Sequence, residues 1–140
     1  RFLGDLSVFD SAMQAKMADI QETSKNNTGL TLNLAVNYGG RRELVSAAAQ
    51  LAADAVSGIL KPEEITTQHL EDKLYTKGEP DVDLIIRPSG EYRLSNFLIW
   101  QSAYAEYVFM DEILWPDFKP ADFDRALEEY QGRSRRFGGI

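Results

Sequence analysis

The sequence contains no cysteine, which excludes disulfides and thiolate-bound metal sites. It also has no run of about 18 apolar residues and no basic-then-apolar leader that ends in a small-residue cleavage site. The only histidine, His69, lies in a polar helical stretch without partners, so it is expected to be structural, and no Ser-His-Asp set or zinc spacing can be formed. These absences favour a cytoplasmic protein.

Positive charge is scarce as well. The formal net charge is −7, which argues against a nucleic-acid surface, because binding to a phosphate backbone needs a basic face. The arginines are nevertheless grouped: Arg87 and Arg93 flank one glycine-containing loop, and Arg133, Arg135 and Arg136 crowd the end of the chain. Two local arginine groups in an acidic protein favour a small anionic ligand over a polymer.

The hydrophobic pattern predicts one α/β domain. The 140 residues are 44% hydrophobic, which is enough to bury a core. Helical spacing predicts helices, the first of them opened by a capping box from Ser7 to Asp10, and period-two or unbroken apolar runs predict strands. The alternation of the two implies a mostly parallel sheet with helices on both faces. The expected helices cover about 7–25, 41–58, 62–75, a turn at 97–103 and a last helix from 120, and the expected strands cover 31–36, 82–86 and 104–110.

Loops at the carboxyl ends of strands are where ligands gather in α/β sheets. Residues 87–96 follow the strand at 82–86 and contain two guanidinium groups, the Ser95 hydroxyl and the backbone freed by Gly90. Such groups suit a diphosphate. The alternative is that Arg87 pairs with Glu91 or a helix end and that Arg93 is solvated.

A second loop, at 37–42, joins a strand to a helix and contains Gly39, Gly40, Arg41 and Arg42. Such a junction exposes N–H groups to anions, but a plain glycine turn with arginines facing water explains it as well. Glu106 is a carboxylate inside an aromatic and aliphatic run, so it faces solvent, pairs with a cation or helps to bind Mg²⁺. The basic residues after 133 are typical of a solvated helix end.

Several motifs together resemble the cis-prenyltransferases, especially bacterial undecaprenyl diphosphate synthases. The resemblance runs from about Arg1 to Gly139, and motifs in the family's order and spacing are far more specific than one glycine loop. The motifs are Asn37-Tyr38-Gly39-Gly40-Arg41, Ile86-Arg87-Pro88-Ser89-Gly90-Glu91, Arg93-Leu94-Ser95-Asn96-Phe97 and Trp115-Pro116-Asp117-Phe118.

The resemblance implies a transferase that condenses isopentenyl diphosphate units onto an allylic diphosphate, farnesyl diphosphate, to make a cis-polyprenyl diphosphate such as undecaprenyl diphosphate. By it, Arg87, Arg93 and Ser95 bind the diphosphate of isopentenyl diphosphate. Glu106 matches the acidic residue that helps to place the Mg²⁺ cofactor. Arg136 and Gly138 match an Arg-x-Gly motif that reaches across a homodimer toward the same diphosphate. A lipid product also implies peripheral membrane contact.

The resemblance further implies that residues 1–140 are the C-terminal portion of one larger catalytic domain. In the family, the N-terminal portion carries the catalytic aspartate, the loop for the allylic diphosphate and most of the hydrophobic tunnel. No counterpart of these is found in the sequence, which starts at Arg1 without a methionine, as a truncated or processed product does. The chain alone is therefore expected to be inactive.

Two other functions fit parts of the pattern. One is a non-catalytic partner subunit that supplies its Arg-x-Gly tail to another chain; the set of Arg87, Arg93 and Ser95 weighs against it. The other is an unrelated nucleotide- or phosphate-binding α/β module. The absence of a glycine-rich first loop followed by a ribose-binding acid weighs against that alternative.

Overall fold

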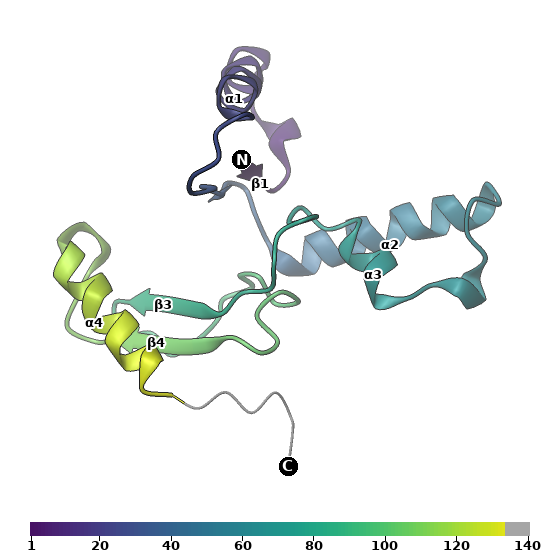
Figure 1. Ribbon diagram of the computed structural model, residues 1–140. Helices are drawn as coiled ribbons and strands as arrows, with labels where there is room; N and C mark the ends of the chain where they lie inside the picture. The colour runs from purple at the N-terminus through teal and green to yellow at the C-terminus, as the bar shows by residue number, and fades with distance from the viewer. Residues whose placement is uncertain (134–140) are drawn as a thin grey trace. The chain divides into compact units, whose positions relative to one another are not determined.

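The computed structural model describes residues 1–133, which contain both helices and strands, with β3 (Leu84–Pro88) followed directly by β4 (Glu106–Met110) (Figure 1). It divides into two compact units, Arg1–Glu79 and Pro80–Ile140. Each unit contains one pair of parallel strands, which confirms the predicted α/β class. The described residues form two separate two-stranded sheets, although the alternation alone predicts a single sheet.

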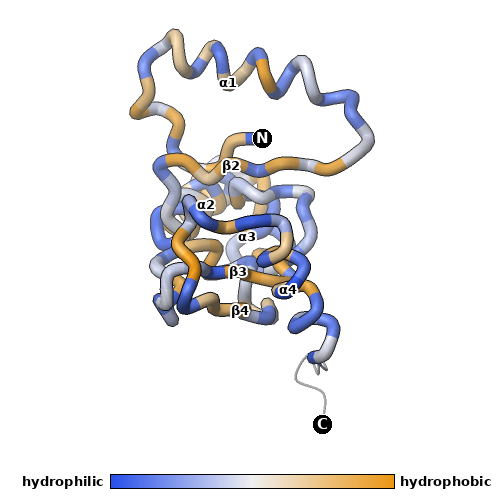
Figure 2. Tube along the Cα trace, turned by 90° about the vertical axis from the view of Figure 1, so that its left-hand side faces the viewer, coloured by the Kyte–Doolittle hydropathy of each residue, from blue (hydrophilic) through white to orange (hydrophobic). Residues whose placement is uncertain are grey.

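In the first unit, β1 (Phe2–Leu3) pairs with β2 (Leu34–Ala35). β2 is shorter than the predicted strand at 31–36 because its partner offers only two residues for pairing. The alternating leucines that predict a buried strand face are exposed: Leu30 by 94%, Leu32 by 62% and Leu34 by 44%. Figure 2 shows hydrophobic positions interspersed with hydrophilic ones along the segment next to β2 and along α1 (Ser11–Ser24).

The start of α1 differs from the prediction. Its N-cap is Asp10, whose carboxylate accepts a hydrogen bond from the Met13 backbone N–H at 2.8 Å. The predicted capping box opened by Ser7 is therefore wrong. Ser7 lies in a 3-10 turn, Leu6–Val8, which Asp5 caps. Asp is as good an N-cap as Ser, and only Asp10 lies directly before the helical backbone.

The helix predicted at 41–58 is confirmed as α2 (Gly40–Val56). Its buried positions Glu43, Ala47 and Leu51 recur every four residues on one face. The helix predicted at 62–75 is mostly turns, with a 3-10 turn at Pro62–Glu64 and a short α3 (Thr67–Glu71). His69 has the structural role expected of it, because its Nδ1 accepts a hydrogen bond from the Thr66 N–H at 3.2 Å.

In the second unit, β3 (Leu84–Pro88) pairs in parallel with β4 (Glu106–Met110). α4 (Pro120–Gln131) lies against one face of this pair, as Figure 1 shows. Val108, Met110 and Ala126 form the core between them, with Leu84 and Ile86 packed against it. Both strands and the last helix agree with the prediction, whereas 97–103 contains only turns. Among residues 1–133, none of the helices has the length and hydrophobicity that a membrane crossing requires.

Candidate diphosphate site

Arg87 lies near the carboxyl end of β3, on the strand-pair face that α4 does not cover. Side chains alternate between the faces of a strand, and Leu84 and Ile86 contact the α4 core. Arg87 therefore shares the opposite face with its register partner Phe109. The sequence positions this guanidinium at a strand end because Gly90, with a φ of +64°, turns the chain directly afterwards.

A cavity of about 370 Å³ opens on this face. Arg87 and Arg93 are its cationic groups, and most of the remaining wall is aromatic or aliphatic. The stacked rings of Tyr107 and Phe109, 6.0 Å apart, form part of the wall. An apolar cavity with a few polar groups is the usual form of a small-molecule site. Its lining consists of Ile85, Ile86, Arg87, Pro88, Ser89, Arg93, Leu94, Phe97, Tyr107, Phe109 and Trp115.

Three of the predicted ligand residues are linked through Arg87 and Glu91, and we call Arg87, Glu91, Arg93 and Ser95 the Arg87 cluster. Arg87 Nη2 donates to Glu91 Oε2 at 2.6 Å and to Ser95 Oγ at 3.3 Å. Arg93 Nη2 lies 2.5 Å from Glu91 Oε1. The predicted alternative, that Arg87 pairs with Glu91, is thus present in the structure. Arg93 is 62% exposed but is not simply solvated, since it shares the same carboxylate.

The arginines shift the ionisation of Glu91. Its pKa lies below the usual value, first because Arg87 hydrogen-bonds to the carboxylate and then because of the charge and hydrogen bond of Arg93, while burial opposes the shift. Glu91 is therefore ionised at neutral pH and partly neutralises both guanidinium groups. A more highly charged anion can compete with it.

Arg87 also keeps one donor unused. Its Nε is buried and has no hydrogen-bond partner among the described residues. Buried polar groups are almost always paired, so this donor is an exception among the buried groups of the site.

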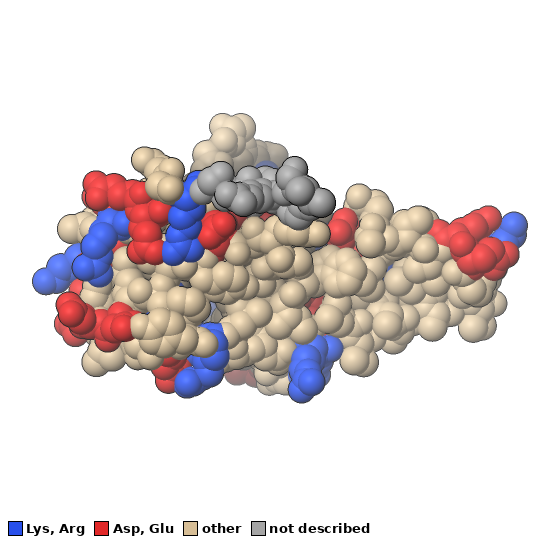
Figure 3. Space-filling model, turned by 90° about the horizontal axis from the view of Figure 1, so that it is seen from below, with Lys and Arg blue, Asp and Glu red and all other residues tan. Residues whose placement is uncertain are grey.

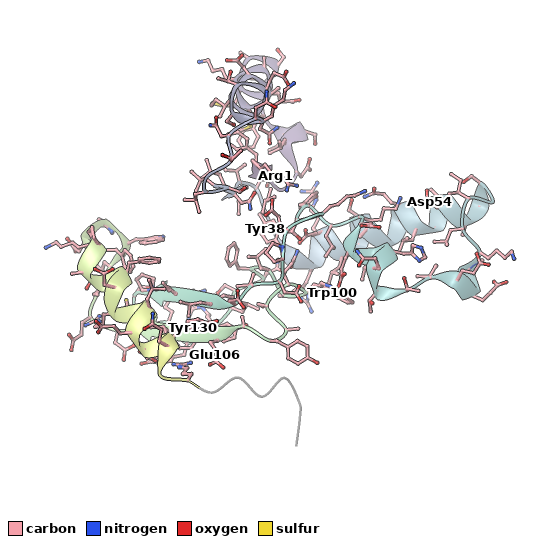
Figure 4. All side chains as sticks on the ribbon, in the orientation of Figure 1. Arg1, Tyr38, Asp54, Trp100, Glu106 and Tyr130 are labelled. Carbon is pink, nitrogen blue, oxygen red and sulfur yellow. The ribbon has the colours of Figure 1, made fainter. Side chains whose placement is uncertain are left out.

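Glu106 is not part of the Arg87 cluster. It opens β4 and pairs in register with Leu84, whereas Arg87 pairs with Phe109 at the other end. Alternation places Glu106 on the α4 face with Val108, opposite to Arg87. Figure 4 shows Glu106 near Tyr130, which belongs to the last turn of α4.

Glu106 pairs with Arg133, a contact that sequence reasoning missed because 27 residues separate the two. Arg133 Nη1 donates to Glu106 Oε2 at 2.9 Å, and Arg133 Nη2 donates to Glu129. Both carboxylates raise the pKa of Arg133, first through the hydrogen bond to Glu106 and then through the hydrogen bond to Glu129, while burial opposes the shift. We call Glu106, Glu129 and Arg133 the Glu106 cluster.

The chemistry of these donors limits how Mg²⁺ can bind. No group of three or more His, Cys, Asp or Glu side chains in residues 1–133 is placed to hold a metal ion. Mg²⁺ is commonly held by one or two carboxylates together with substrate phosphates and water. Glu106 fits that mode, as one carboxylate for a cation that arrives with a diphosphate. Arg136 and Gly138, the remaining predicted ligands, lie outside the described residues.

The loop at 37–42 belongs to the first unit, where its groups are engaged in local contacts. The Asn37 side chain donates to Asp5 O at 2.9 Å, and Arg42 forms an ion pair with the Asp5 carboxylate. Glu43, only 1% exposed, accepts from the Tyr75 backbone N–H at 2.8 Å and from the Tyr38 hydroxyl. Sequence reasoning missed this buried carboxylate. The signal that was available is the helical spacing, which places Glu43 on the same face as Ala47 and Leu51.

Known proteins resemble the whole chain. The prenyltransferase family of undecaprenyl diphosphate synthases matches residues 1–138. An isoprenyl transferase from Prochlorococcus marinus subsp. pastoris is 46% identical over 140 residues, which are 100% of this chain and 51% of that protein. The farnesyl-diphosphate-specific ditrans,polycis-undecaprenyl-diphosphate synthase of Pasteurella multocida is 50% identical over 137 residues, 98% of this chain and 57% of that protein. The chain thus spans about half the length of these relatives.

A solved structure gives the same result for the fold. Lavandulyl diphosphate synthase from Lavandula x intermedia, in complex with dimethylallyl diphosphate, superimposes with a TM-score of 0.94 at 40% identity. The match covers 98% of this chain and 58% of that one. Fold and sequence agree that the chain belongs to the undecaprenyl diphosphate synthase family of prenyltransferases.

Proposed function

We propose that this chain supplies the isopentenyl diphosphate site of a cis-prenyltransferase. The observation that carries the proposal is the Arg87 cluster on the wall of a mostly apolar cavity. Guanidinium groups and a hydroxyl suit the diphosphate, and the aromatic wall suits a short hydrocarbon chain. By its resemblance to the Pasteurella relative, the enzyme extends farnesyl diphosphate to undecaprenyl diphosphate.

The reaction is an alkyl transfer. The allylic diphosphate departs while carbocation character develops at its C1, the double bond of isopentenyl diphosphate forms the new carbon–carbon bond, and a proton is then lost. The barrier is charge separation, so catalysis depends on stabilising the leaving group and aligning the acceptor. Bound Mg²⁺ supplies positive charge to the diphosphates. The residues of this chain hold the acceptor.

The Glu91 carboxylate is paired with Arg87 and Arg93 when no substrate is bound. We propose that the substrate diphosphate displaces this carboxylate from the two guanidinium groups. Two guanidinium groups share this single carboxylate. Diphosphate oxygens accept the freed hydrogen bonds of Arg87 and Arg93. The exchange keeps the arginines ordered before binding, which lowers the conformational entropy lost on binding.

We further propose that Glu106 and the Arg136–Gly138 motif of one copy act on the Arg87 cluster of a second copy. Within one chain, Glu106 and Arg87 lie on opposite faces and at opposite ends of the strand pair. Three residues along a strand span about 10 Å, so one diphosphate cannot easily reach both. A symmetric homodimer supplies both groups to each site. We expect the enzyme in the cytoplasm, with peripheral membrane contact for its product.

The alternative is a non-catalytic partner subunit, which would need no acceptor site of its own.

The test is Arg93→Ala in the full-length enzyme, meaning a polypeptide with these 140 residues within the complete length of the family. Loss of one charge-assisted contact, worth about 1.5–3 kcal/mol, should weaken isopentenyl diphosphate use about 10- to 150-fold. Allylic diphosphate binding should stay unchanged. Arg125→Ala, on the exposed side of α4, is the control. Unchanged acceptor kinetics would remove Arg93 from the site.

A further inference from the structure

Arg133 is the last residue that the structure describes, and it joins two elements. Its Nη1 contacts Glu106 at the start of β4, and its Nη2 contacts Glu129 on α4. The Arg133 side chain is 33% exposed and that of Glu106 is 27% exposed, so the pair is partly shielded from solvent. Figure 3 shows acidic and basic side chains next to one another on the face seen from below.

Each terminal nitrogen of the planar Arg133 guanidinium is bound to a different carboxylate. The group therefore has little freedom to rotate. On Glu106, Arg133 engages Oε2. Arg133 therefore orients the Glu106 carboxylate through one of its two oxygens.

We propose that Arg133 is a positioning residue, which holds the Glu106 carboxylate in one fixed orientation. The inference rests on the proposed metal-placing role of Glu106. Carboxylates that bind metals are usually oriented by a hydrogen-bonded neighbour, and loss of that neighbour typically costs 10- to 100-fold in metal affinity or activity.

A simpler role must be distinguished. Arg133 follows the last turn of α4, where a cation is favoured by the helix dipole, and Glu129 stands four residues before it. A residue that served only the helix end would affect stability and nothing else. The proposal predicts in addition an effect on acceptor binding that depends on Mg²⁺ and on Glu106.

The experiment measures binding of isopentenyl diphosphate alone to the full-length enzyme by calorimetry, at low and at high Mg²⁺, so that no turnover occurs. The variants are Arg133→Gln, Arg133→Lys, Glu106→Gln and the double variant Arg133→Gln with Glu106→Gln. Arg125→Gln is the matched control, because Arg125 lies on α4, the helix that precedes Arg133, is 57% exposed and forms an ion pair with Asp122 at 4.0 Å. Melting temperatures are recorded for all of them.

Arg133→Gln should weaken Mg²⁺-supported binding about 10- to 100-fold, and high Mg²⁺ should recover part of the loss. Arg133→Lys should recover part of it as well, since lysine keeps the charge without the fork. The double variant should bind no worse than Glu106→Gln, because both changes remove the same interaction. Arg125→Gln should bind like the parent.

The outcomes separate the two proposals. Normal Mg²⁺-supported binding by Glu106→Gln would overturn the metal role of Glu106 itself. A defect in Glu106→Gln without one in Arg133→Gln would overturn the role of Arg133 alone, as would additive effects in the double variant. A lower melting temperature with equal binding at both Mg²⁺ levels would reduce Arg133 to a helix-end residue. If Arg133→Gln does not fold, Glu129→Gln releases one side of the fork, and its failure to alter binding would also overturn the proposal.

Discussion

Two charged clusters occupy the same pair of strands, and they differ in which charge is in surplus. In the Arg87 cluster, two guanidinium groups surround one carboxylate, so one positive charge is left over. In the Glu106 cluster, one guanidinium lies between two carboxylates, so one negative charge is left over. The first cluster suits an anion and the second suits a cation.

A count of ion pairs would treat the two clusters as equivalent, since each contains two. Partly exposed ion pairs contribute little to stability, so the balance of charges is more informative than their number. The backbone differs as well. Arg87 is followed by a loop in which Ser89, Ser95 and Asn96 have positive φ, whereas Glu106 and Glu129 belong to a regular strand and a regular helix. Strained backbone often marks a functional site.

The largest expected effect comes from a subunit-mixing test of whether the two clusters cooperate between copies. Full-length Arg87→Ala and Glu106→Gln enzymes are mixed, and subunit exchange is verified. If the clusters act in trans, the mixed dimer contains one intact site, so activity should rise well above that of either parent dimer. The measurement is the initial rate of isopentenyl diphosphate incorporation.

The control for this test is built from the same variants. Arg87→Ala mixed with Arg136→Ala should also regain activity, because the tail and Glu106 serve the same distant site. Glu106→Gln mixed with Arg136→Ala should regain none, since every site then lacks one trans group. Failure of both Arg87→Ala mixtures would show that each chain completes its own site.

Periodicity predicted the regular elements well where they were long. The four-residue spacing in α2 and the apolar runs in β3 and β4 are patterns of hydrophobic burial within a single element. Local sequence is enough to reveal such a pattern. β1 was missed because two residues carry no period. The extent of β2 was overestimated because the alternation of leucines indicates a face but not whether anything in the described part of the chain covers it.

The candidate site could be predicted only in part. Arg87, Arg93 and Ser95 are close in sequence on one loop, so their convergence followed from the turn at Gly90 and from the resemblance. The separation of Glu106 from Arg87 depends on the register of β3 and β4 and on which face α4 covers. Neither is encoded locally. Arg133 was not connected with Glu106 for the same reason.

A smaller effect, on the melting temperature, is expected from the negative charge of Glu91. Its pKa is lower in the folded protein than in the unfolded chain, so its contribution to stability is present above the ordinary glutamate pKa of about 4.3 and is lost as the pH falls through the folded value. The melting temperature of the parent should therefore exceed that of Glu91→Gln more at pH 7 than at pH 3. Glu22→Gln, on an exposed helix pair with Lys25, is the control. An equal difference at both pH values would mean that the arginines do not stabilise the carboxylate.

The smallest effect is expected from the backbone of the Arg87 cluster, at Ser89. Its φ of +84° is unfavourable for a residue with a Cβ, at about 1–2 kcal/mol, whereas glycine adopts it freely but loses about 0.5–1 kcal/mol of chain entropy. Ser89→Gly should therefore raise the free energy of unfolding by about 0.5–1 kcal/mol, measured by denaturant titration. The backbone hydrogen bond from Ser89 N to Ile113 O, 2.7 Å long, is kept in the variant. Ser46→Gly inside α2 is the matched control and should lower stability by about 0.5–1 kcal/mol, because glycine is unfavourable in a helix interior. If both variants are destabilised equally, residue 89 is not strained, and the contrast in backbone between the two clusters fails.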